Sequence, residues 1–299
     1  MTYAQSAQAS AAIRERTIGV LCGLVVVALF SGFTLVSRIG FSSALTLPDI
    51  AALRFGIGGT LLLPVLLRHG LSGVSWRDAA ALAFLGGLGF ALFAYAGFSL
   101  APASHGAVLL HGTLPLFTFA LSAALVGATA TRAKVAGVAL ISLGVAAMAL
   151  DSLSGATGRQ LLGDAALLLA SACWSGYGLL VKRLDLPPAR AAAIVAVFSM
   201  VCFLPVYAVL PGTVLFAADW RDVLVQAVFQ GVFIGAVSIF VYTRAVAALG
   251  AAETALFTAA VPCVTTLAAI PLLSEVPNVA GVAGVATVTA GMIIAMRRL

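Results

Sequence analysis

Hydrophobic residues along the chain gather in long runs, which short segments rich in proline, glycine and charged residues separate. A helix needs about twenty apolar residues to cross the hydrocarbon core of a bilayer. Runs of about this length occur ten times in the sequence, and they predict an all-α fold with ten transmembrane helices. The expected spans are 17–37, 50–67, 79–99, 105–126, 134–150, 163–181, 191–210, 223–243, 254–273 and 279–296.

The composition agrees with a polytopic membrane protein. Hydrophobic residues make up 62% of the 299 residues and charged residues only 9%, whereas a soluble domain carries about a quarter charged residues. The four cysteines lie inside apolar runs without the spacing of a metal site. We interpret them as small buried side chains, and we expect neither a metal nor a cofactor.

Lysine and arginine residues in the connecting segments predict the orientation. With both termini in the cytoplasm, the inner segments hold twelve of these cations and the outer segments three, which satisfies the positive-inside rule. The net charge of +6 is then a signal for membrane topology, and no nucleic-acid partner is expected. Arginine outnumbers lysine fourteen to two in an alanine-rich chain, which indicates a GC-rich bacterial genome and an inner-membrane location.

The sequence contains an internal repeat. The stretch LFSGFTLVSRIG at 29–40 returns as CWSGYGLLVKRL at 173–184, so that Phe30 aligns with Trp174, Ser31 with Ser175, Phe33 with Tyr177 and Arg38 with Lys182. A second alignment, offset by 147 residues, pairs Tyr95 with Tyr242, Pro115 with Pro262, Thr118 with Thr265, Gly137 with Gly284 and Gly144 with Gly291.

Each copy of the repeat contains five spans, so the second copy must enter the membrane from the opposite side. We therefore expect a short disordered cytoplasmic lead at 1–16, a first five-helix repeat at 17–150 and an inverted second repeat at 151–299. Inverted repeats are typical of transporters that work by alternating access, with a central cavity between the halves.

Ten spans in two halves, each led by an aromatic-Ser-Gly helix, resemble the ten-helix EamA branch of the drug/metabolite transporter superfamily. Within that branch, the chain is similar to the YddG-type bacterial exporters of aromatic and other amino acids. The resemblance covers 17–296. It implies that the first, third, fourth, sixth, eighth and ninth helices line the central cavity, and that the fifth and tenth pack the halves together.

The first and sixth spans each carry a polar stripe at helical spacing. Ser31 and Thr34 lie on the first stripe and Ser175 on the second, with Trp174 and Tyr177 beside it. We expect these five side chains to bind the substrate. The alternative is an interfacial aromatic belt with serines bonded to their own helix. For Arg38 and Lys182, at the ends of the stripes, we favour contact with lipid head groups over ligand binding.

The fourth and ninth spans each contain a proline, Pro115 and Pro262, which should bend the helix beside the cavity. His111 lies one turn before Pro115, and Thr258 is its counterpart before Pro262. We expect both to bind the substrate, with His111 as a ligand contact or proton acceptor. The alternative for His111 is a hydrogen bond to a neighbouring helix.

Three further residues complete the expected binding site. Gln230 in the eighth span suits a zwitterion because its amide can donate and accept, although it could equally bond another helix. Tyr95 and Tyr242 are included as repeat-related aromatic residues. Arg54, a turn into the second span, is expected either to pair with Asp49 or to act at a gate.

No aspartate or glutamate lies well inside a predicted span, which favours neutral or zwitterionic cargo over strongly cationic cargo. The sequence thus predicts a secondary exporter of small metabolites, foremost aromatic and apolar amino acids, that functions as a monomer in the lipid bilayer. The alternatives are a carrier of other metabolites or drugs, such as sugar phosphates or organic cations, and an intramembrane enzyme, for which no catalytic residues are found.

Overall fold

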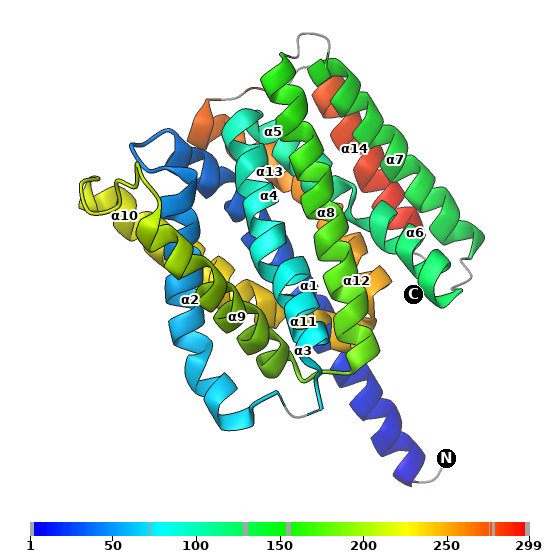
Figure 1. The fold of residues 1–299 in the computed structure, drawn as a ribbon. Coiled ribbons are helices and arrows are strands. Elements are labelled where there is room, and N and C mark those ends of the chain that lie inside the picture. Colours follow the sequence, from blue (N-terminus) through cyan, green and yellow to red (C-terminus); the bar gives the residue numbers. More distant parts are fainter. Residues whose placement is uncertain are drawn as a thin grey trace.

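The computed structural model describes residues 3–71, 73–127, 131–153, 157–274, 276 and 279–296, and these parts contain helices and no strands (Figure 1). The predicted all-α membrane fold is confirmed. Eight helical segments of the described chain are long and apolar enough to cross a bilayer, and Val282–Ala295 is a shorter apolar helix. The eight are Ser10–Phe41, Leu47–His69, Trp76–Leu100, Gly106–Leu125, Gly158–Leu184, Pro188–Val209, Trp220–Leu249 and Ala251–Leu273.

Each predicted span coincides with observed helices, except that Leu210 lies just beyond α9 and that turns at 113 and 259–260 interrupt the fourth and ninth spans. The first half contains α1 (Tyr3–Phe41), α2 (Leu47–His69), α3 (Trp76–Ala83), η1 (Phe84–Leu88), α4 (Gly89–Leu100), α5 (Ala103–His105), η2 (Gly106–Gly112), α6 (Leu114–Val126) and α7 (Arg132–Leu153). The second half contains α8 (Gly158–Leu184), α9 (Pro188–Val209), α10 (Trp220–Gln226), η3 (Ala227–Ser238), α11 (Ile239–Leu249), α12 (Ala251–Thr258), α13 (Val261–Leu273) and α14 (Val279–Met296).

The expectation of a disordered lead at 1–16 was wrong, because α1 already begins at Tyr3. The segment is rich in alanine and glutamine, which favour helix. It continues directly into the apolar part of the same helix, so no second nucleation step is needed. The cations Arg297 and Arg298, which were counted for the orientation, lie outside the described residues.

Three spans contain π-helical segments, which the hydrophobic pattern did not predict. The segments η1 and η3 lie in the third and eighth spans, which are counterparts in the two halves, and η2 lies in the fourth span. In the ninth span α12 ends at Thr258 and α13 begins at Val261. Pro115 and Pro262 each stand in the first turn of the helix that follows the interruption.

The helices α7 and α14 pack side by side (Figure 1) and show how the halves are related. A Cβ atom on Gly137 would lie 2.6 Å from the Gly291 carbonyl oxygen, and one on Gly144 would lie 2.9 Å from the Gly284 carbonyl oxygen. Gly137 is the counterpart of Gly284, and Gly144 that of Gly291. The two contacts are therefore the same contact made twice, as antiparallel helices related by a pseudo-twofold axis require.

The buried core is made of large aromatic side chains rather than aliphatic ones alone. The largest fully buried side chains include Trp174, Tyr95, Tyr177, Tyr242 and Phe30. They come from α1, α4, α8 and α11, which thus meet at the centre of the bundle.

Candidate functional site

All ten residues expected to bind a ligand are buried, with exposed fractions between 0 and 3%. They come from seven helical segments of both halves, α1, α4, η2, α8, η3, α11 and α12. In the structure, some of them belong to an aromatic cluster, some form hydrogen bonds within or between helices, and Tyr95, which is bonded to Gln230, lies next to Arg54.

The central aromatic cluster consists of Phe30, His111, Trp174, Tyr177 and Tyr242. The Phe30 ring is stacked on His111 with centroids 5.1 Å apart, meets Trp174 edge to face at 5.5 Å and stacks on Tyr242 at 6.1 Å. Trp174 also lies 5.2 Å from Tyr177 and 4.9 Å from Tyr242. Residues distant in the sequence therefore form one set of flat apolar surfaces.

Polar atoms without partners belong to this cluster and to the residue that follows Phe30. Neither ring nitrogen of His111 has a hydrogen-bond partner among the described residues, and neither does the hydroxyl of Ser31, the residue next to Phe30. An unmade hydrogen bond of a buried group costs about 1–3 kcal/mol, so buried polar atoms are normally paired. Unpaired buried donors and acceptors beside aromatic rings suit the binding of a molecule that has both a polar group and a flat apolar part.

Other expected residues form hydrogen bonds within a helix or between helices. The Ser175 hydroxyl donates to the Leu114 carbonyl at 3.3 Å, and the Thr34 hydroxyl bonds Phe30 in its own helix at 3.4 Å. The Tyr177 and Thr243 hydroxyls are 2.6 Å apart. The alternative that the serines bond their own helix is not what the structure shows, because Ser175 bonds another helix and the Ser31 hydroxyl has no partner among the described residues.

Thr258 supports the helix break at Pro115. Because proline has no N–H, Pro115 cannot donate to the carbonyl of His111 one turn before it. The Thr258 hydroxyl lies 3.3 Å from that carbonyl oxygen and also bonds the Ala255 carbonyl. The counterpart of His111 in the second half thus contacts the His111 backbone directly.

A second group of aromatic rings adjoins the central cluster and encloses a cation. We call Phe33, Phe90 and Tyr95 the Arg54 cage, because the Arg54 guanidinium carbon lies 5.3, 5.4 and 5.9 Å from their ring centroids. The cage is continuous with the cluster, since Phe90 lies 4.5 Å from Trp174 and Phe33 lies 6.5 Å from His111.

Arg54 was not among the residues expected to bind a ligand, and the structure does not show the proposed pair with Asp49. The Asp49 carboxylate instead accepts hydrogen bonds from Thr46, from the Tyr207 hydroxyl at 2.7 Å and from the Val214 backbone. Arg54 is only 1% exposed, and its two terminal nitrogens form no hydrogen bond with the described residues. The only sequence signal for this residue was a cation inside an apolar run.

Gln230 connects the cage to α1. Its side-chain oxygen accepts a hydrogen bond from the Tyr95 hydroxyl at 3.0 Å, and its nitrogen donates to the Ser37 hydroxyl at 2.9 Å. The amide therefore uses one donor and one acceptor to join η3, α4 and α1, and it fixes the position of the Tyr95 ring.

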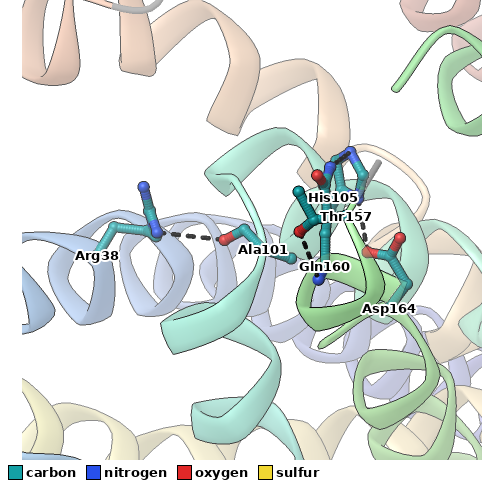
Figure 2. A network of polar contacts seen from close by, with 6 residues as sticks. All are labelled: Arg38, Ala101, His105, Thr157, Gln160 and Asp164. Atoms are coloured by element: carbon teal, nitrogen blue, oxygen red, sulfur yellow. Dashed lines mark hydrogen bonds and ion pairs between the residues drawn. The ribbon is translucent and has the colours of Figure 1, made fainter. Parts of the chain in front are cut away.

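Polar networks lie beyond the aromatic residues, toward the two ends of α1. Near its last turn, His105 Nδ1 lies 2.5 Å from Asp164 Oδ1 and His105 Nε2 lies 3.3 Å from Gln160 Nε2. Figure 2 shows this pair together with Arg38, whose guanidinium donates to the Ala101 carbonyl at 3.2 Å. The sequence pattern favoured contact of Arg38 with lipid head groups. In the structure, Arg38 instead donates to the backbone at the end of a neighbouring helix.

At the opposite end of the bundle, ion pairs join other segments. Arg244 lies 2.6 Å from Glu15, and Lys134 lies 3.8 Å from Glu253. Each of these pairs joins the first half to the second, as His105 and Asp164 do. In the part of the chain that the structure describes, no group of three or more histidine, cysteine, aspartate or glutamate residues is arranged to hold a metal ion.

Comparisons with known proteins agree with the repeat. Two segments, residues 17–150 and 161–297, match the model of the EamA-like transporter family. A search of the curated proteins gave no significant match. Among the solved structures, one crystal structure has a TM-score of 0.67 at 22% sequence identity and covers 93% of this chain and 97% of its own. At this identity the likeness shows the fold alone.

Proposed function

Because the chain belongs to the EamA-like transporter family, it is a secondary transporter of small molecules, and we propose that it exports amino acids with aromatic or apolar side chains. The proposal includes a bacterial inner-membrane location with both termini in the cytoplasm. The amino-acid substrate follows the resemblance of the sequence to YddG-type exporters.

The observation that carries this proposal is that the central aromatic cluster includes His111, whose ring nitrogens are unpaired among the described residues, and adjoins Ser31 in the sequence, whose hydroxyl is unpaired too. An aromatic amino acid combines a flat apolar ring with a small polar head. The rings of Phe30, Trp174 and Tyr242 suit the first part, and the unpaired atoms of Ser31 and His111 suit the second. Ser31, Thr34, Tyr95, His111, Trp174, Ser175, Tyr177, Gln230, Tyr242 and Thr258 are proposed to bind the substrate directly or to position the residues that do.

The proposed mechanism is alternating access between the two halves, 17–150 and 151–299. The centre is buried, and pairs that join the halves lie at both ends. With cytoplasmic termini, the pair of His105 and Asp164 closes the outer side, whereas the pairs Arg244 with Glu15 and Lys134 with Glu253 close the inner side. If the pairs on one side of the membrane break while those on the other side persist, the central cluster is exposed to one side of the membrane at a time.

The experiment that tests the function is flux through liposomes containing the purified protein. Labelled phenylalanine, tryptophan, methionine, threonine and a sugar phosphate are compared, with and without a pH gradient. We expect phenylalanine and tryptophan to move fastest. Movement of the sugar phosphate alone would contradict the proposal and support the alternative of an anion carrier.

A further inference from the structure

Arg54 is a permanently charged group in the interior of the protein. It belongs to α2 and is 1% exposed, and a guanidinium cannot lose its proton under physiological conditions. The faces of Phe33, Phe90 and Tyr95 surround it within 6 Å. Cation–π contacts stabilise a cation but leave its N–H donors unused.

No carboxylate of the described chain neutralises Arg54. The Tyr95 hydroxyl oxygen interacts with Arg54 electrostatically and as a hydrogen-bond acceptor, but this hydroxyl is neutral and donates its proton to Gln230, so it does not balance the charge of Arg54. Asp49, which precedes Arg54 on α2, is bonded to Thr46, Tyr207 and Val214. An unpaired charge in a membrane interior is costly and usually marks a functional site.

A small cavity is lined in part by Arg54. Residues of α2, η1, α9, η3 and α11 line it, among them Gly87, Ser199 and Gly235. Gly87 and Gly235 belong to the π-helical segments η1 and η3. In this conformation the cavity has room for little more than one water molecule. A ligand therefore enters only when the packed helices separate, as alternating access requires.

From these observations we propose that Arg54 binds the carboxylate of the transported molecule and that the carboxylate is the group the protein requires. The inference rests on the proposed function and deepens it, because it names the carboxylate as the group of the amino acid that is recognised and makes the ammonium dispensable. The chemical class is a monocarboxylate with an aromatic or apolar body. Its carboxylate would form the paired N–H···O bonds that the guanidinium fork favours.

The charge balance favours a carboxylate over a phosphate. One guanidinium neutralises one negative charge, and no second cation of the described residues contacts the cage. A phosphate dianion would keep an uncompensated charge in a buried site. The apolar body of the ligand would lie toward Trp174, because Phe90 contacts both Arg54 and Trp174.

The ammonium group has weaker partners than the carboxylate. Neutral acceptors are available near the cage, among them the His111 ring and the Ser31 hydroxyl, but no carboxylate of the described residues lies in the cluster. Hydrogen bonds to such neutral acceptors are weaker than a charge pair. An acid that lacks the amine should therefore bind, and an amine that lacks the acid should not.

The test uses the full-length protein in nanodiscs. One measurement follows how well each probe displaces labelled phenylalanine, and a second follows direct binding of each probe by tryptophan fluorescence. The probes are phenylalanine, 3-phenylpropionate, phenethylamine and phenyl phosphate. We expect the dissociation constant of 3-phenylpropionate to lie within about tenfold of that of phenylalanine. The dissociation constants of phenethylamine and phenyl phosphate should be at least about tenfold higher than that of phenylalanine. This comparison needs no variant and so does not depend on how substitutions fold.

Variants then assign the effect to the residue. Arg54→Gln should lower the affinity for phenylalanine and 3-phenylpropionate by about tenfold or more and leave the affinity for phenethylamine unchanged. Arg54→Lys keeps the charge but loses the planar guanidinium, so its affinity for the two carboxylates should lie between those of the wild type and Arg54→Gln. Arg221→Gln is the matched control, because Arg221 is an exposed cation that lies over Trp220. Thermal unfolding and gel filtration of each variant check the fold.

The outcomes separate this inference from the proposed function. Equal binding of phenylalanine and phenethylamine would overturn the role of Arg54 and leave amino-acid transport standing. Tight binding of 3-phenylpropionate without any flux of phenylalanine would support the carboxylate site and contradict the amino-acid exporter. Preferential binding of phenyl phosphate, or binding of none of the probes, would overturn the inference.

Discussion

Phe30 and Trp174 occupy the same position in the two repeats, and their rings meet edge to face with centroids 5.5 Å apart and planes inclined by 76°. Two counterparts can touch only where the axis that relates the halves passes between them. The same axis passes between His111 and Thr258, whose side chain lies against the His111 backbone. The central aromatic cluster therefore lies where the two halves must move relative to each other.

Replacing Trp174 should separate packing from recognition. Trp174→Ala removes ring contacts to Phe30, Phe90, Tyr177 and Tyr242, each of which contributes about 0.5–1.5 kcal/mol. We expect phenylalanine flux into liposomes to fall at least about tenfold. Trp174→Phe keeps an aromatic face and should keep most of the flux. Equal loss in both variants would show that the indole, rather than an aromatic surface, is needed.

The contact between α7 and α14 should be sensitive to one added methyl group. In Gly137→Ala, the new Cβ would lie 2.6 Å from the Gly291 carbonyl oxygen, and such overpacking costs roughly 1–3 kcal/mol. We expect thermal unfolding in detergent to occur several degrees lower. Gly158→Ala is the control, because no atom lies within 4 Å of the added Cβ. Equal stability of the two variants would contradict the close antiparallel packing.

The periodicity of the sequence was sufficient to predict the helices and the inverted repeat. Phe30, Trp174, Gly137 and Gly291 carried the repeat in the sequence, and they make its cross-contacts in the structure. These features are local patterns, and each half repeats them. They were therefore visible without knowledge of how distant segments pack.

The role of Arg54 could not be read in the same way. In the sequence it lies close to Asp49, which suggested an ordinary ion pair. In the structure Tyr207 and Val214, from distant segments, bond Asp49 and leave Arg54 among aromatic rings. The segments η1 and η3 were missed because the hydrophobic pattern of a π-helical segment resembles that of the helix around it. Long-range packing decides both features.

A carboxylate next to the Arg54 cage should compete with a bound carboxylate. Gln230→Glu places an acid beside the Tyr95 hydroxyl, to which Gln230 is bonded at 3.0 Å. We expect the affinity for 3-phenylpropionate, measured by fluorescence, to fall about tenfold through charge repulsion and neutralisation of Arg54. Gln230→Met, which removes the amide without adding charge, should weaken binding less. A larger loss in the methionine variant would show that the amide itself matters most.

The pair of His105 and Asp164 should control access to the centre from one side. Asp164→Asn removes the charge from a contact of 2.5 Å between the halves, so this end should open more often. The reporter is Ser31→Cys in a background without the four native cysteines, since the Ser31 hydroxyl has no partner to lose. We expect a membrane-impermeant thiol reagent to label it several times faster. The control is Asp222→Asn at the start of α10, and equal rates in the two variants would contradict the gate.

The central claim, that two inverted halves carry an amino acid by alternating access, is tested most directly by counterflow. Liposomes with the purified protein are loaded with unlabelled phenylalanine and diluted into a trace of labelled phenylalanine. A carrier that exposes the site to one side at a time should give transient accumulation of label above equilibrium, abolished by Trp174→Ala. Label that only approaches equilibrium without an overshoot, or that does not enter at all, would contradict the account.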